Sequence, residues 1–156
     1  METVQVRALT FPCPEGYHVM DETERAKLRF AEEGEGVCLS APEKHVLISL
    51  ACTQVGPLLP LLLGSREIAA HASKKIEKPM ALMDYKAGPL LRRTVGGEGA
   101  DGFSYTYTAQ DIPMYGETLV VKAGRVLYYL HFYARQALRD EIVEEWVRLL
   151  GEARWG

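Results

Sequence analysis

The residues Val126-Leu-Tyr-Tyr-Leu-His-Phe-Tyr-Ala134 form the stretch from which the fold can be worked out. Successive side chains of a β-strand point to opposite faces of a sheet, and aromatic and β-branched residues favour strands. Read as a strand, the stretch carries one row made of Tyr128, Leu130 and Phe132 and a second row made of Tyr129, His131 and Tyr133. The first row suits an apolar core, whereas the second mixes aromatic and polar groups.

Three shorter segments before this stretch have the same strand-like character, at residues 90–95, 103–108 and 117–122. Turns that are rich in glycine or contain proline separate them, so the four segments together predict an antiparallel meander. The glycine-rich stretch 96–102 is interpreted as a flexible connection between two of these strands. A phosphate-binding loop is not predicted there, because no Lys-Ser or Lys-Thr pair follows and the next segment alternates like a strand.

Further strands are predicted upstream, at residues 9–12, 37–41 and 45–52, and a hairpin is predicted over residues 17–32. The strands can be assigned to faces by alternation. One face is expected to be continuously apolar and to hold Val46, Ile48, Leu50, Phe103, Tyr105, Tyr107, Leu119, Val121, Tyr128, Leu130 and Phe132. The other is expected to be amphipathic and partly wet, and to hold His45, Ser49, Ser104, Thr106, Thr108, Thr118, Lys122, Tyr129, His131 and Tyr133.

Two main helices are predicted, near residues 65–78 and 136–151, because apolar side chains recur there at helical spacing and charged side chains fill the opposite side. Pro79 ends the first of them. Strands grouped before and after one helix favour the α+β class over a regular parallel sheet. The predicted architecture is a twisted antiparallel sheet in an α/β/α sandwich.

Length and composition indicate one domain over residues 1–156. The hydrophobic fraction of 47% is that of an ordinary globular protein, and the net charge of -3 gives no general attraction to nucleic acid or anionic lipid. The first residues lack the features of a signal peptide, and the longest apolar run, Leu58 to Leu63, is too short to span a membrane. Three irregularly spaced cysteines are typical of reduced thiols, so a cytoplasmic location is expected.

The sequence carries no motif of catalytic chemistry, and no cofactor is predicted. The four histidines lack the local spacing of metal ligands, so no metal site is predicted either. The residues kept as candidates for binding are Tyr129, His131 and Tyr133, together with Ser49 and Arg92. Aromatic clusters in strands are more often sheet packing than recognition surfaces, so packing remains the alternative interpretation.

The order of these elements resembles the fold shared by the PsbP, Mog and DcrB-like families. The resemblance covers residues 9–150. It rests on Leu9-Thr-Phe-Pro-Cys-Pro-Glu-Gly-Tyr17, on a strand followed by a helix from His45 to Lys78, on Gly-Gly-Glu-Gly before Phe103-Ser-Tyr-Thr-Tyr107, on Gly124-Arg-Val-Leu-Tyr-Tyr-Leu130 and on the last amphipathic helix. Members of that fold act in binding and chaperoning, among them cytoplasmic bacterial adaptors that shelter apolar helices. The resemblance therefore implies a noncatalytic protein and carries no active site.

Three functional hypotheses follow. The first is a noncatalytic protein-binding or chaperone-like module with a polypeptide partner. The second is a small-molecule binder or hydrolase whose pocket lies on the amphipathic face. The third is a homodimer that buries the apolar patch Leu58-Leu-Pro-Leu-Leu-Leu63.

Overall fold

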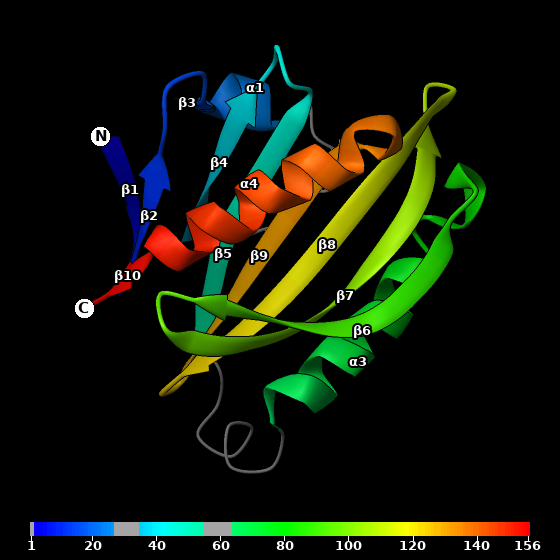
Figure 1. Ribbon diagram of the computed structural model, residues 1–156. Coiled ribbons are helices and arrows are strands. Elements are labelled where there is room, and N and C mark those ends of the chain that lie inside the picture. The colour runs from blue at the N-terminus through cyan, green and yellow to red at the C-terminus, as the bar shows by residue number, and fades with distance from the viewer. Residues whose placement is uncertain (1, 27–34, 55–63) are drawn as a thin grey trace.

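The computed structural model describes residues 2–26, 35–54 and 64–156, and its main feature is a seven-stranded antiparallel sheet (Figure 1). In spatial order its strands are β3 (His18–Val19), β4 (Glu35–Ala41), β5 (Val46–Gln54), β9 (Val126–Arg135), β8 (Ile112–Ala123), β7 (Glu98–Ala109) and β6 (Lys86–Val95). The last four are consecutive in the chain, which confirms the predicted meander.

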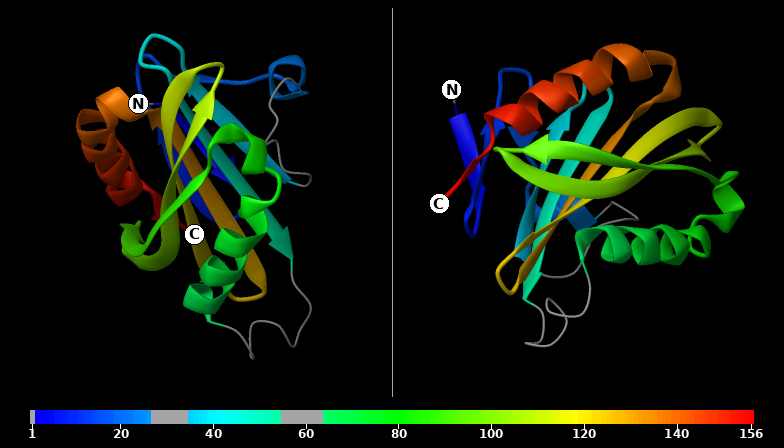
Figure 2. Two further views of the ribbon diagram at one scale, coloured as in Figure 1. Left: turned by 90° about the vertical axis from the view of Figure 1, so that its right-hand side faces the viewer. Right: turned by 60° about the horizontal axis from the view of Figure 1, so that its bottom comes forward.

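The two main helices lie on opposite sides of this sheet, as Figure 2 shows. They are α3 (Ser65–Glu77) and α4 (Arg139–Glu152). Both predicted helices and the antiparallel α+β sandwich are thus confirmed. A short helix α1 (Glu22–Ala26) and two 3₁₀ turns, η1 (Ala81–Met83) and η2 (Gln136–Leu138), complete the helical elements of the described residues.

The sheet face toward α4 carries the larger core. Trp146, Leu149 and Leu150 of α4 are fully buried against Leu130 and Phe132 of β9. The rings of Phe132 and Trp146 stack with their centroids 5.0 Å apart. This face is apolar, as the alternation of β9 predicts.

A small three-stranded sheet shares this face with α4. It consists of β1 (Glu2–Val6), β2 (Leu9–Cys13) and β10 (Arg154–Trp155), with β2 in the middle. The first and last strands of the chain therefore both pair with β2, one on each side of it (Figure 1). The predicted strand at 9–12 is confirmed. β1 and β10 were not predicted, because β1 has only two apolar residues, Val4 and Val6, and β10 has only two residues in all.

Tight turns set the register of the meander. Gly96 and Gly97 join β6 to β7 with φ angles of 55° and 88°, and Gln110 and Asp111 join β7 to β8 with φ angles of 51° and 65°. Positive φ at both central residues is typical of the two-residue hairpin turns whose twist matches that of the strands. The prediction of a flexible connection over 96–102 is therefore wrong, because β7 already begins at Glu98.

The predicted faces of β7 are also wrong. Phe103 lies opposite Thr118, and Tyr105 lies opposite Gly116. Phe103, Tyr105 and Tyr107 consequently face α3 and pack with Met80 in a second core. Ser104 takes the other face, opposite Glu117, and is buried. The α3 face of the sheet is thus far more apolar than predicted.

Two other predictions concern the loops. In the hairpin predicted over 17–32, the turn is wrong, because Glu22 and Glu24 belong to α1; the first strand is β3, which pairs with β4, and the second, residues 27–32, lies outside the described residues. The patch at 58–63 also lies outside the described residues, so its role in a homodimer remains a prediction. Within the described ranges, no helix is long and apolar enough to cross a membrane.

Candidate functional site

The side chains of Tyr129, His131 and Tyr133 form a continuous row on the α3 face of the sheet, here called the β9 row. The rings of Tyr129 and His131 are nearly parallel, at 5° with centroids 6.4 Å apart, and those of His131 and Tyr133 lie at 10° and 6.2 Å. The distance between neighbouring rings follows from the geometry of a β-strand, because every second side chain points to the same side. The predicted grouping of these three residues is confirmed in space.

The β9 row is mostly buried, so the prediction of a partly wet row is wrong. His131 is 7% exposed and Tyr133 is 5% exposed, whereas Tyr129 is half-buried. The imidazole Nδ1 of His131 lies 2.9 Å from the hydroxyl of Thr118, which is also buried. A binding role for these residues must therefore work through hollows beside the row rather than through an open surface.

Ser49 joins the row and Arg92 does not. Ser49 of β5 lies directly opposite His131 of β9 and is buried with it. Arg92 lies on the edge strand β6, paired with Asp101, and is separated from β9 by β7 and β8. Arg92 lines a separate hollow beside Arg66, near the start of α3. The structure thus brings four of the five candidate residues together.

One hollow lies between α3 and the sheet beside the β9 row, and we call it the α3 pocket. Its volume is about 430 Å³, and its polar and aromatic floor comes from Phe103, Thr118, Tyr129 and His131. Ala72, Lys75 and Ile76 of α3 line it from above, and Ala51 and Thr53 of β5 line its side. Helix α3 itself contacts β6, β7 and β8, which leaves room for the pocket along β5 and β9.

A second hollow opens at the other end of the β9 row, where Tyr133 forms part of its wall. We call it the methionine groove, because Met20, Met83 and Met114 line it. Its volume is about 770 Å³, and Leu47, Leu82 and Tyr107 add further apolar surface. Leu82, in η1, is fully exposed. Sequence reasoning missed this groove because its lining comes from segments that only the fold brings together.

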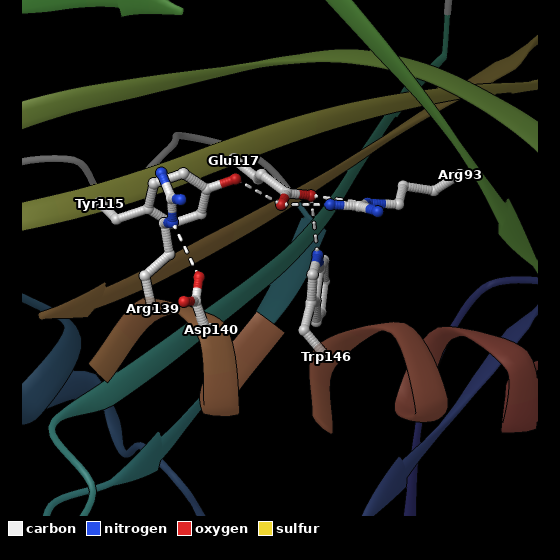
Figure 3. A network of polar contacts seen from close by, with 6 residues as sticks. All are labelled: Arg93, Tyr115, Glu117, Arg139, Asp140 and Trp146. Carbon is white, nitrogen blue, oxygen red and sulfur yellow. Dashed lines mark hydrogen bonds and ion pairs between the residues drawn. The ribbon is translucent and has the colours of Figure 1, made fainter. Parts of the chain in front are cut away.

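The most connected polar group of the described structure lies on the opposite face, away from both hollows. Glu117 is completely buried, and its Oε1 accepts hydrogen bonds from Arg93 Nε at 3.1 Å and from Trp146 Nε1 at 3.1 Å (Figure 3). Its Oε2 accepts from Arg93 Nη2 at 2.8 Å and from the Tyr115 hydroxyl at 2.7 Å. These bonds raise the pKa of Arg93, while burial raises that of Tyr115.

Four donors occupy the acceptor positions of this carboxylate, so it has little capacity left to accept a proton from a substrate. The group therefore fastens α4 to the sheet and does not provide a general base. Among the described residues, no three histidine, cysteine or acidic side chains gather as they would around a metal ion.

Comparison of the chain with solved structures shows its fold. The solution structure of the cyanobacterial PsbP protein CyanoP from Synechocystis superposes with a TM-score of 0.66 and 13% identity over 96% of this chain and 87% of that one. The crystal structure of LpqN, involved in cell envelope biogenesis of Mycobacterium tuberculosis, gives 0.58 and 13% over 94% and 82%. No protein-family model and no curated protein sequence matches the chain. The chain has a PsbP-like fold, as the sequence resemblance predicted.

Proposed function

We propose that this chain, with its PsbP-like fold, is a noncatalytic polypeptide-binding module that takes up apolar side chains of its partner in the methionine groove. The observation that carries the proposal is the fully exposed Leu82 at the edge of a groove lined by Met20, Met83 and Met114. Exposed apolar surface combined with polar residues, here Ser40, Thr108 and Gln110 of the same groove, is typical of an interaction site.

The chemistry of the groove supports a polypeptide partner over a rigid small ligand. Methionine side chains are unbranched and polarisable, and proteins that accept varied partners use them to adapt to different side chains. A volume of about 770 Å³ has room for several apolar side chains of one segment. The rings of Tyr107 and Tyr133 provide a firm wall against which those side chains can pack.

A noncatalytic role is supported by the way the buried polar groups are used. Both oxygens of Glu117 are occupied by donors from the sheet and from α4. A general base needs a proton of the substrate within reach, and this carboxylate is engaged in holding the structure. The three cysteines are free and buried, which supports the reducing, cytoplasmic location we propose.

The test is a selection of binding peptides from a random library, followed by calorimetric titration against matched variants. Leu82→Asp puts a charge at the groove and should weaken the selected peptides about tenfold, equivalent to about 1.4 kcal/mol. Val147→Asp, at an exposed apolar residue of α4 on the opposite face, is the control and should bind as the wild type does. Selected peptides that bind both variants equally, or a library that yields no peptide, would overturn the proposal.

A further inference from the structure

We propose that the α3 pocket is a separate binding site for a small planar aromatic carboxylate. This site goes beyond the proposed function, because its lining differs from that of the methionine groove. A hollow of about 430 Å³ is within the range of small-molecule sites, which combine an apolar lining with a few well-placed polar groups.

The first argument is the polar pair in the floor of the pocket. Thr118 is 2% exposed and bonds to His131. Phe103 lies opposite Thr118, the Tyr105 hydroxyl lies 3.5 Å from the Thr118 hydroxyl, and buried Ser49 lies opposite His131. Replacing a whole buried polar group by apolar side chains of the same shape costs little stability, so folding alone does not require polar residues here. A polar pair that borders a hollow is therefore better explained by a ligand that it orients.

The second argument is the shape of the aromatic lining. The rings of Tyr129 and His131 lie nearly parallel along the floor, and Phe103 borders the same hollow. Aromatic side chains bind flat rings by offset stacking and edge-to-face contacts. Ile76 and Ala72 close the pocket from above with apolar surface. A flat ring fits this lining better than a branched aliphatic group.

The third argument is the charge at the mouth of the pocket. Lys75 is exposed on α3 and lines the pocket, and within the described part of the chain it makes no ion pair. A lysine ammonium is a mobile point charge on a flexible stem, so it can reach a carboxylate on a ring seated in the pocket. The pocket lining contains no acidic residue among the described ones, so it favours an anion over a cation.

The test is calorimetric titration with 2-naphthoate, its neutral analogue naphthalene-2-methanol and its cationic analogue naphthalen-2-ylmethylammonium. We expect affinity to fall in that order. Lys75→Met should weaken 2-naphthoate about fivefold and leave naphthalene-2-methanol unchanged, because an exposed ion pair is worth up to about 1 kcal/mol. Lys74→Met, an exposed neighbour that does not line the pocket, should leave both affinities unchanged.

Two further variants locate the ligand. Ala72→Phe should fill the pocket and abolish binding of both ligands, whereas Leu82→Asp in the methionine groove should change neither. If Ala72→Phe does not fold, the backbone amide shifts of Thr53 and Lys75 in the wild-type chain on adding 2-naphthoate decide the location. Failure of 2-naphthoate to bind at millimolar concentration, equal affinity of all three probes, or loss of binding in Leu82→Asp would overturn the proposal.

Discussion

The indole nitrogen of Trp146 donates a hydrogen bond to Oε1 of Glu117 across 3.1 Å, and both side chains are completely buried. The bond joins the middle of α4 to the middle of the sheet. Apolar packing alone allows a helix to slide or rotate, whereas a buried directional bond fixes one orientation. Arg93 and Tyr115 of the sheet bind the same carboxylate, so Glu117 joins α4 to two strands at once.

Replacing the Glu117 carboxylate should therefore strongly lower the stability of the fold. We expect Glu117→Ala to lower the free energy of unfolding by about 3–5 kcal/mol, because the partly buried charge of Arg93 loses its partner, two buried donors lose their acceptor and a cavity is left. Urea unfolding followed by tryptophan fluorescence and by circular dichroism measures the effect. Glu152→Ala, at the exposed end of α4, is the control and should change stability by less than about 0.5 kcal/mol. A loss below about 1 kcal/mol for Glu117→Ala would show that the network contributes little.

The two rows of β9 should differ in how much stability they supply. Phe132→Ala should cost about 3–5 kcal/mol, because the ring is fully buried against Trp146. His131→Ala should cost about 1–3 kcal/mol, because the imidazole is buried and its loss leaves the Thr118 hydroxyl without that partner. Thermal and urea unfolding of both variants compare the two. An unchanged stability in His131→Ala would contradict the buried position of the row.

Two glycines of β7 should tolerate substitution very differently. A Cβ on Gly102 would collide with the backbone carbonyl of Thr118 on β8, which cannot move without disturbing the sheet. A Cβ on Gly99 would meet only the guanidinium of Arg92, the far end of a flexible side chain. We expect Gly102→Ala to cost about 3 kcal/mol and Gly99→Ala less than about 1 kcal/mol, measured by urea unfolding. Equal losses would contradict the close approach of β7 to β8.

Stability should fall in alkaline solution. Burial raises the pKa of Tyr17, Tyr107 and Tyr115 above the usual value of about 10. The folded state then holds phenolic protons that the unfolded chain has lost, so the stabilisation is complete below about pH 10 and is lost as the pH rises toward the folded pKa. Urea unfolding at a series of pH values above 9 or so measures the slope.

Tyr107→Phe is the matched control for this pH effect, because it removes one buried phenol and keeps the ring. The slope of stability against pH should be shallower in this variant than in the wild type. In the wild type, phenolate absorbance measured without denaturant should rise at a higher pH than that of the chain unfolded in urea. An identical slope would mean that Tyr107 ionises as freely in the folded state as in the unfolded one.

Much of the fold follows from patterns within single elements. The apolar spacing of α3 and α4 predicts both helices, because a helix must turn its apolar residues toward one partner. Alternation in β9 predicts two rows, and both exist. Alternation within one strand does not show which of its two rows lies on the same sheet face as a given row of the next strand.

The turns between strands decide which rows share a face, as the wrongly predicted faces of β7 show. The turn of Gln110 and Asp111 has only two residues, so Ala109 must lie opposite Ile112 and, by counting back, Phe103 must lie opposite Thr118. The turn residues Gln110-Asp111 are not the Asn-Gly or Asp-Gly pair that usually signals such a turn, and the register was therefore missed. The methionine groove was missed for a related reason, since η1 and the start of β8 meet only after the sheet has formed.

The small sheet also bears on how the chain is made. β2 pairs with β10, so Leu9 and Thr10 find Trp155 and Arg154 as partners only at the far end of the chain. On a translating ribosome the apolar residues of β2 leave the exit tunnel long before the strand and helix that cover them. Phe11 of the nascent chain therefore stays uncovered until α4 has emerged, and the domain completes its folding only once α4 and β10 are both outside the tunnel.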